Sequence, residues 1–266
     1  MGKGHDHGNK PEHYTYDPVG NRLTGRRSKD YYIYNQGNQL TEDREYLYEY
    51  DRNGNLIRKT EVDDDGEEKI WSYYYDYENR LIKVVKEEED ETRVVTFKYD
   101  PFGRRIEKRI EEIEDGEVKE VKTHTYVYDN EDIILEYVSI SGHEEGEGHH
   151  GHQGRRHNKH HKDRDSQYVI KYLHGPGVDE PLAIEQKGKV YYYHADGLGS
   201  ITALTDQRGR VVQRYEYDSF GNMKHHGNKI KQPYTFTGRE WDKEIGLYYY
   251  RARMSRGILN VPFSGK

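Results

Sequence analysis

The sequence of 266 residues predicts an all-β fold, built as an array of antiparallel β-hairpins. Two observations predict it. A tyrosine–aspartate pair recurs along the chain, each time followed by a short turn with glycine or asparagine. The segments between these turns alternate apolar and polar residues. A phrase that returns at a regular interval indicates a repeat architecture. Alternation at period two indicates strands with one buried and one solvated face.

We call each such turn a repeat turn. The clearest copies have the tyrosine, the aspartate and, in all but one, a glycine three residues after the aspartate: Tyr16, Asp17 and Gly20; Tyr50, Asp51 and Gly54; Tyr75 and Asp76; Tyr99, Asp100 and Gly103; Tyr217, Asp218 and Gly221. Degenerate copies start at Tyr34 and Tyr128. The copies at Tyr50, Tyr75 and Tyr99 lie about 25 residues apart, inside the range typical of repeat arrays. Each interval has room for one hairpin.

The aspartates of the repeat turns allow two interpretations. An aspartate in a turn accepts a hydrogen bond from the backbone N–H two residues further on. A pair of carboxylates also performs acid–base chemistry in glycosidases. The regular recurrence at turns favours the structural role.

The first half of the chain reads as successive hairpins between repeat turns. In the second of them, Val95, Phe97 and Tyr99 fall on one face, the one that we expect to be buried. The charged runs at residues 86–91 and 107–120 are expected on turns and outer faces, where they keep strand edges soluble. The outgoing and returning strands are expected at residues 56–62 and 70–75, 81–85 and 92–99, and 106–113 and 118–128.

Composition narrows the class of protein. Hydrophobic residues make up only 32% and charged residues 34%, but the chain has 27 tyrosines against 5 phenylalanines. Tyrosine is a strong strand former with an apolar body and a polar tip, so an ordered sheet is expected despite the low hydropathy. The net charge of −7 disfavours nucleic-acid binding. There is no cysteine and no apolar run long enough for a membrane span. Residues 1–13 lack the apolar run of a signal peptide.

The chain divides into five segments. A low-complexity insert interrupts two hairpin-rich parts, and polar tails flank them. The segments are a Gly/His-rich tail (1–13), the hairpin array (14–140), a His-rich insert (141–167), a second hairpin segment (168–253) and a C-terminal tail (254–266).

The insert is the main candidate for metal binding. Imidazole suits zinc, copper or nickel, so a divalent transition metal is the expected cofactor if there is one. The other interpretations are a solvated linker and a pH-responsive patch near the histidine pKa. The candidate ligands are His149, His150, His152, His157, His160 and His161.

Tyrosine clusters at three places, residues 73–75, 191–193 and 248–250. They are interpreted as cross-strand ladders that hold the sheet. A platform for the apolar faces of sugars is the alternative. Trp71 and Trp241 are expected in the core or at its rim.

The second hairpin segment carries longer motifs. These are residues 192–200 with the following Leu204-Thr205-Asp206, residues 215–222, residues 236–240, and residues 246–253. Together with the repeat turns they resemble the RHS/YD-repeat family, bacterial relatives of the teneurin shell. The residues that match the family's core motif are His194, Asp196, Gly199, Gly238, Arg239, Glu240, Gly246, Tyr249 and Arg251.

The resemblance implies that the hairpins coil into a curved ribbon, a partial shell or a tube. It also implies that the core ends in an aspartate–proline stretch at which toxin-bearing relatives cut themselves. The residues that follow Arg251, at 254–263, depart from that pattern, and no aspartate follows Asp242. Self-cleavage needs two carboxylates close together, so no catalytic residue is carried over and a non-enzymatic protein is predicted.

A short array has two open ends with unpaired strand edges. The leading hypothesis is therefore a structural protein that self-associates end to end into an extracellular or cell-surface filament or tube, in a bacterium or archaeon. The alternative is an RHS shell core of a toxin or contact-dependent competition system without its toxin. The third is a cell-surface module that binds carbohydrate or metal.

Overall fold

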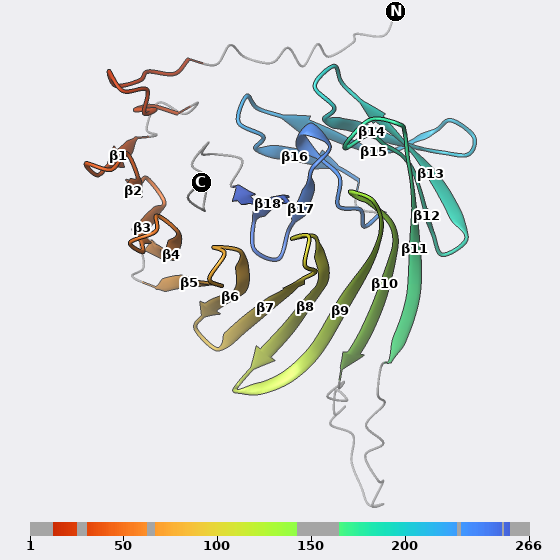
Figure 1. The fold of residues 1–266 in the computed structure, drawn as a ribbon, viewed down its shortest axis with the longest axis horizontal. Helices are drawn as coiled ribbons and strands as arrows, with labels where there is room; N and C mark the ends of the chain where they lie inside the picture. The colour runs from red at the N-terminus through yellow and green to blue at the C-terminus, as the bar shows by residue number, and fades with distance from the viewer. Residues whose placement is uncertain are drawn as a thin grey trace, which may run out of the picture.

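A computed structural model of the chain describes residues 13–25, 31–62, 67–142, 165–227, 230–251 and 253–255. Its main feature is one strongly curved antiparallel sheet of 16 strands, with a three-stranded sheet inside the curve (Figure 1). The prediction of an all-β array of antiparallel hairpins is confirmed. So is the curved ribbon or partial shell, because the first and last strands of the large sheet do not pair with each other.

The large sheet runs in chain order from β1 to β16. Its first half consists of β1 (Tyr32–Tyr34), β2 (Leu40–Asp43), β3 (Tyr46–Tyr50), β4 (Leu56–Val62), β5 (Glu68–Tyr75), β6 (Leu81–Glu88), β7 (Glu91–Tyr99) and β8 (Arg105–Glu114). Its second half consists of β9 (Glu117–Asp129), β10 (Asp132–Gly142), β11 (Ser166–His174), β12 (Pro181–Gln186), β13 (Lys189–Ala195), β14 (Ile201–Asp206), β15 (Val211–Tyr217) and β16 (Met223–His226).

Every strand of the large sheet pairs with the next one in sequence. Short turns favour this order because they bring consecutive strands side by side. Alternate connections lie at opposite edges of the sheet, so the repeat turns that follow β3, β5, β7 and β15 all share one edge. The pairing continues from β10 to β11, with Val138 opposite Tyr168, although more than twenty residues separate the two strands in the sequence.

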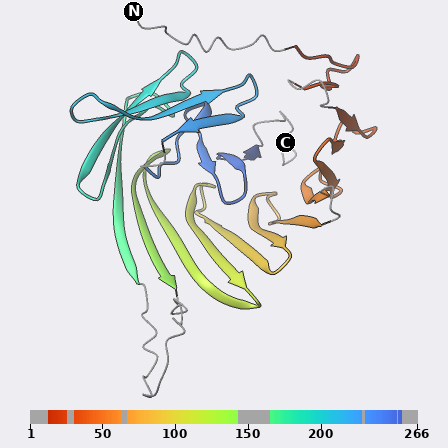
Figure 2. The same cartoon turned by 180° about the vertical axis from the view of Figure 1, so that it is seen from behind.

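The C-terminal segment turns back into the curve. A short 3-10 helix, η1 (Phe236–Gly238), precedes β17 (Glu240–Asp242), β18 (Leu247–Tyr250) and β19 (Arg253–Ser255). Among the named strands these three pair only with one another, and a single bridge joins Glu240 of β17 to Tyr234; we call the three strands the C-terminal hairpin. Figures 1 and 2, which view the molecule from opposite sides, both show β17 and β18 inside the curve. The large sheet therefore packs against a part of its own chain.

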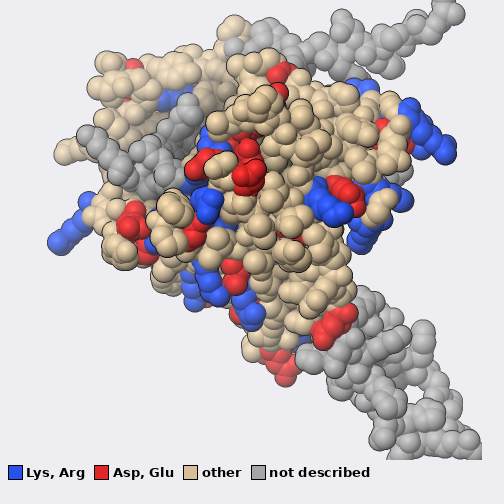
Figure 3. Space-filling model, turned by 45° about the vertical axis from the view of Figure 1, so that its right-hand side comes forward, with Lys and Arg blue, Asp and Glu red and all other residues tan. Residues whose placement is uncertain are grey.

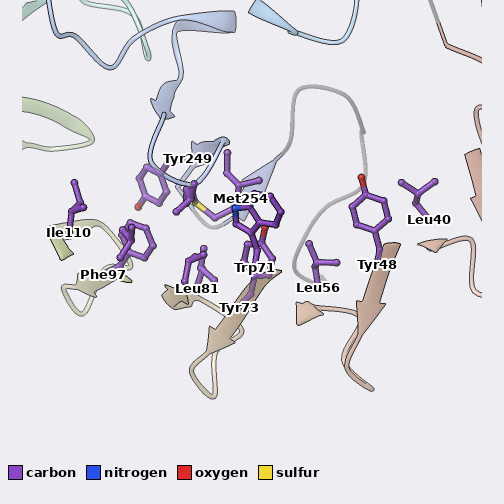
Figure 4. Packing of buried hydrophobic residues seen from close by; sticks show 14 residues of the cluster. Leu40, Tyr48, Leu56, Trp71, Tyr73, Leu81, Phe97, Ile110, Tyr249 and Met254 are labelled. Carbon is purple, nitrogen blue, oxygen red and sulfur yellow. The ribbon is translucent and has the colours of Figure 1, made fainter. Parts of the chain in front are cut away.

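The apolar core lies on the concave face. In the first half of the sheet, the C-terminal hairpin supplies Tyr249 and Met254, whose side chains reach towards Phe97, Leu81 and Trp71 (Figure 4). Val95 and Phe97 are buried as the alternation predicted. Full burial of such a side chain stabilises the fold by about 1.5–3 kcal/mol.

A second core cluster lies under β9 to β15. It consists of Tyr126, Ile133, Val138, Ile170, Tyr172, Ile184, Tyr193, Ile201, Leu204, Tyr215, Ile230 and Tyr234. Ile230 and Tyr234 come from the segment that leads into η1, so this segment closes the second cluster as the C-terminal hairpin closes the first.

One expectation about charge is wrong. Residues 107–120 were expected on turns and outer faces, but Lys108 is buried on the inner face, with 6% of its surface exposed. The reason is that the C-terminal hairpin presents a carboxylate to it: the Nζ of Lys108 lies 2.8 Å from an oxygen of Asp242. A local pattern of charges carries no information about a partner so distant in sequence.

The two ends of the large sheet meet through side chains. β1 and β16 share no hydrogen bonds, but the ring of Tyr14 packs edge-on against Phe220 with centroids 4.8 Å apart. The Arg22 guanidinium carbon lies 4.0 Å from the Phe220 centroid and 4.3 Å from that of Tyr32. Cation–π contacts of this kind bridge the ends where no strands pair. The sequence did not predict this contact.

On the face shown in Figure 3, basic and acidic side chains are interspersed, and neither kind forms a large patch. Among the described residues no helix is long and apolar enough to cross a membrane.

Candidate functional site in the concave face

The repeat turn at Asp100 shows how the recurring phrase folds. The N–H of Asp100 donates to the carbonyl of Arg104 at 2.9 Å, and the N–H of Gly103 donates to the carbonyl of Asp100 at 3.0 Å. Gly103 has a φ of 81°, which glycine adopts without strain. One oxygen of the Asp100 carboxylate accepts the N–H groups of Phe102 and Arg104, and the other accepts Nε of Arg104 at 2.7 Å. The carboxylate is fully engaged within its own turn.

The other copies repeat this geometry. In each, one carboxylate oxygen accepts the backbone N–H groups two and four residues further on, and the residue at the fourth position is Asn, Arg or Ser. These aspartates are Asp17, Asp51, Asp76, Asp218, Asp196 and Asp206. The glycines at the third position, Gly20, Gly54, Gly199, Gly209 and Gly221, all have positive φ. The geometry is that of a turn-forming device, in which each carboxylate bonds within its own turn.

The tyrosines of the repeat turns have a role that the sequence did not reveal. The hydroxyl of Tyr99 donates to the carbonyl of Leu81 at 2.7 Å, and that of Tyr75 donates to Leu56 at 3.0 Å. Each acceptor is the fifth residue after the aspartate of the preceding repeat turn. Tyr217 bonds Ile201 in the same way, at 2.7 Å, and Ile201 is the fifth residue after Asp196, whose turn is the previous one on the same edge of the sheet. Burial raises the pKa of these tyrosines, so the hydroxyls keep their protons.

We call these bonds tyrosine ties, because each links one repeat to the one before it. Tyr128, from a degenerate copy, makes the same bond to the carbonyl of Arg105 at 2.8 Å. Tyr16 lies on the surface instead, 54% exposed. The acceptor is always the fifth residue after an aspartate, but the number of residues from that aspartate to the tyrosine varies, so the sequence alone carried no fixed spacing that predicts the ties.

The residues of the RHS-like core motif do not converge on one site. His194 bonds Thr205 across β13 and β14 at 2.9 Å, and Asp196 and Gly199 form the turn that follows. Gly246, with a φ of 68°, lies in the turn between β17 and β18. The motif residues are therefore spread between the large sheet and the C-terminal hairpin.

Three motif residues converge on Asp179, which the sequence analysis missed. Arg239 and Arg251 each place a guanidinium nitrogen 3.0 Å from Oδ1 of Asp179. A Cβ added to Gly238 would lie 2.5 Å from the Asp179 carbonyl oxygen. Burial raises the pKa of Asp179 against the opposing effect of the two arginines. Asp179 lies in the loop between β11 and β12, so these contacts fasten the C-terminal segment to that loop.

A buried ion network fastens the C-terminal hairpin to β8. Arg105, only 1% exposed, pairs with Asp242 and with Glu240, the latter at 2.7 Å. Lys108 bridges Asp242 and Glu244, at 2.8 and 3.3 Å. Burial acts to raise the pKa of Asp242, but the two cations outweigh it and the pKa is lowered. Burial raises the pKa of Glu240, which has one cation partner fewer.

Beside this network lies a cavity of about 410 Å³. Its walls come from the inner faces of β8 to β11, β15 and the start of β16 on one side, and from residues 230–235 and β17 on the other. Four tyrosines line it, Tyr126, Tyr168, Tyr172 and Tyr215. A cavity of this size falls in the range of small-molecule sites, about 300–1,000 Å³.

A buried hydrogen-bonded group lies in the wall of the cavity. Glu136 accepts the hydroxyl of Tyr172 with one oxygen and bonds Nδ1 of His124 with the other. Burial acts to raise the pKa of Glu136, but the bond from His124 outweighs it and the pKa is lowered. Burial lowers the pKa of His124. Glu136 therefore accepts the Nδ1 proton of a neutral imidazole, and Nε2 keeps its lone pair.

The predicted metal site cannot be compared with the structure, because His149, His150, His152, His157, His160 and His161 lie outside the described residues. Within the described residues no three His, Cys, Asp or Glu side chains are grouped to hold a metal ion.

Comparison with known proteins places these features in context. A family model described as teneurin YD-shell matches residues 3–116. Two nucleases are 32% identical over 94 residues, the tRNA3(Ser)-specific nuclease WapA of Bacillus spizizenii and the tRNA nuclease WapA of Bacillus subtilis. The match covers 34% of this chain and 4% of each nuclease. Salivary gland surface protein 1 of Aedes aegypti is 37% identical over 90 residues, 32% of this chain and 3% of that protein.

Among solved structures, the crystal structure of TcdB2-TccC3 matches with a TM-score of 0.54 at 15% sequence identity. The match covers 94% of this chain and 16% of that chain. At this identity the similarity concerns the fold alone. The chain thus spans a small part of the length of each of these relatives.

Proposed function

Since the chain belongs to the RHS/YD-repeat family, we propose that it is a non-enzymatic scaffold, a wall segment that lengthens end to end into a shell, tube or filament outside the cell. The observation that carries this proposal is the large sheet itself. It curves around its own C-terminal hairpin, and among the described residues β16 pairs on one side only, with β15. A strand with an unpaired edge is a template for another strand.

Analytical ultracentrifugation over a range of concentrations, together with electron microscopy, tests the assembly. We expect association that grows with concentration and yields filaments or tubes. Single proline substitutions at each position of Met223–His226 probe the edge. Where the replaced residue directs its N–H away from β15, proline removes a donor that an added strand would need and leaves the bonds to β15 intact. At least one such variant should stay folded and fail to associate. A wild-type chain that remains monomeric at high concentration and forms no filaments contradicts end-to-end assembly.

The second candidate function is the wall of a toxin shell. The observation that favours it is the identity to two WapA proteins that are named as nucleases. In this case the concave face contributes to an enclosure around a separate toxic segment. The genes beside this one discriminate between the candidates, since a secretion apparatus and an immunity gene are expected only for the toxin shell.

A further inference from the structure

Three residues that line the cavity in the concave face each carry a buried polar atom that has no hydrogen-bond partner among the described residues. Nε2 of His124, Oε1 of Gln232 and Nε of Arg105 make no hydrogen bond, although each is buried. All three residues line the cavity. A buried polar group without a partner costs about 1–3 kcal/mol, so such groups require an explanation.

The unpartnered atoms include both hydrogen-bond acceptors and hydrogen-bond donors. Because Glu136 accepts the Nδ1 proton, Nε2 of His124 is an acceptor. Oε1 of Gln232 is an amide oxygen and therefore also an acceptor, while the amide nitrogen of Gln232 already donates to Tyr215 at 2.6 Å. Nε of Arg105 is a donor. Lys122 adds a second donor, because no described carboxylate forms an ion pair with its ammonium group and burial lowers its pKa to about 8. A hydroxyl group, which both donates and accepts, matches such a set.

The charges that line the cavity nearly cancel. Five basic residues, Arg105, Lys108, Lys122, Lys231 and Lys243, stand against four acidic residues, Glu136, Glu240, Asp242 and Glu244. The shortest ion pairs, those of Arg105 and Lys108, already join these groups to each other. The cavity therefore has little net charge with which to attract an ion, and its ligand should be neutral.

The walls supply flat apolar surface between the polar atoms. Tyr126 and Tyr172 are buried, whereas Tyr168 is only partly buried. Val138 on β10 is paired with His124 on one side and with Tyr168 on the other, so these residues lie on the same face of the sheet. Aromatic rings with polar tips pack against the apolar face of a sugar ring and still hydrogen-bond at its edge. None of the three tyrosine runs at residues 73–75, 191–193 and 248–250 contributes to this wall.

We propose that this cavity binds a neutral polyhydroxylated ligand, of the size of a mono- or disaccharide, with hydroxyl groups on His124 and Gln232 and a ring face on the tyrosines. The site differs from the end-to-end assembly proposed above, because it lies in the concave face and takes only Met223 from β16, whose unpaired backbone edge is the surface for assembly.

Saturation-transfer NMR on the full chain, with glucose, maltose, cellobiose and diacetylchitobiose as probes at millimolar concentrations, tests the proposal. We expect transfer from aromatic protons of the protein to ring protons of at least one neutral probe. Tyr168→Ala, at the rim, and His124→Gln, in the wall, should each weaken binding about tenfold. Thermal unfolding shows whether each variant is folded. If His124→Gln does not fold, Tyr168→Ala still tests the proposal.

The matched control is Tyr137→Ala. Tyr137 lies on β10, is 47% exposed and does not line the cavity, so its loss should leave binding unchanged. The proposal fails if no neutral probe receives saturation, or if Tyr137→Ala weakens binding as much as Tyr168→Ala. It also fails if glucuronate binds and the neutral sugars do not, because the cavity is then a site for anions.

Discussion

At the scale of single residues, the repeat turn is a self-contained hydrogen-bonded unit. A carboxylate with two oxygens meets three donors within the next four residues, and a residue with positive φ closes the turn. The aspartate therefore determines where a strand ends, and its recurrence determines the length of each hairpin. Such a unit needs no contact with the rest of the fold, which is why the sequence reveals it.

Replacing the aspartate of one turn tests this unit. We expect Asp100→Ala to lower the free energy of unfolding by about 1–3 kcal/mol, because two backbone N–H groups and the Arg104 side chain lose their acceptor. Urea unfolding followed by circular dichroism measures the change. The control is Asp90→Ala, since Asp90 lies in an ordinary hairpin turn and its carboxylate accepts no hydrogen bond from a described residue. Equal losses in both variants contradict the role assigned to Asp100.

The same carboxylates predict how stability depends on pH. Burial acts to raise the pKa of Asp76 and Asp100, but the hydrogen bonds of the turn outweigh it, so the folded-state pKa is lowered. A lowered pKa contributes stability above the unfolded-state pKa of about 3.9, and this contribution is lost as the pH falls through the folded-state value. Urea midpoints should hold from pH 7 to 5 and then fall towards pH 2. In Asp100→Ala the fall should be smaller, and a fall as steep as that of the wild type excludes Asp100 as a source.

At the scale of elements, the tyrosine ties set the spacing between repeats. A hydrogen bond from a half-buried hydroxyl to the carbonyl that opens an earlier strand holds two turns of the same edge together. The C-terminal hairpin acts across the sheet instead, through the ion network on Arg105 and Lys108. One device orders the ribbon along its length, and the other keeps it wrapped around its core.

Removing a single hydroxyl tests the ties. Tyr99→Phe should lower the free energy of unfolding by about 1–2 kcal/mol, because the carbonyl of Leu81 loses a buried partner while the ring remains. Tyr77→Phe is the control, since Tyr77 is 90% exposed, and its change should be close to zero. Chemical denaturation measures the free energy of unfolding of both variants. A loss in Tyr99→Phe no larger than that in Tyr77→Phe would mean that Tyr99 stabilises the fold by ring packing alone.

The ion network predicts a larger effect. Asp242→Asn should cost about 3–5 kcal/mol, the range for breaking a buried pair, because Arg105 and Lys108 both lose a charged partner. The exposed pair of Glu49 and Arg58, at 3.9 Å, provides the comparison, and Glu49→Gln should change stability by less than about 1 kcal/mol. Denaturant unfolding measures both, and similar small costs contradict a network that fastens the hairpin.

The sequence predicted the elements better than their contacts. Strand alternation and turn chemistry are local, so Val95, Phe97 and the repeat turns were predictable from neighbours in the chain. The pairing of Arg105 with Asp242 joins residues 137 positions apart, and no periodicity encodes it. The cavity wall was partly visible, because Lys122, His124 and Tyr126 alternate along β9. Their common face was not interpreted as a site, because the segment that covers it lies more than a hundred residues further on.

At the scale of the whole molecule, few contacts join the two ends of the curved sheet. Its ends share no backbone hydrogen bonds, and Phe220 stands between Tyr14 and Arg22. Such contacts contribute about 0.5–2 kcal/mol each, much less than a paired strand. The curvature must therefore come mostly from the packing of the concave face on the C-terminal hairpin.

Small-angle X-ray scattering tests whether the contact at Phe220 holds the two ends of the sheet together. Phe220→Ala should increase the radius of gyration, because the first repeat turn loses its aromatic partner at the other end of the sheet. Phe102→Ala is a matched control, since Phe102 occupies the same position of another repeat turn and is 84% exposed. An unchanged radius in both variants shows that the ends are held by other means.

The buried C-terminal hairpin has a consequence for how the protein is made. During synthesis the strands β1 to β16 leave the ribosome before residues 240–254, which cover Arg105, Lys108 and the first apolar cluster. Contacts this far apart in sequence form slowly, and nascent chains with exposed apolar faces are prone to aggregate. The inner surface therefore stays unprotected until residues 240–254 have been made, so the demand for chaperones should peak while these residues are still inside the ribosomal exit tunnel.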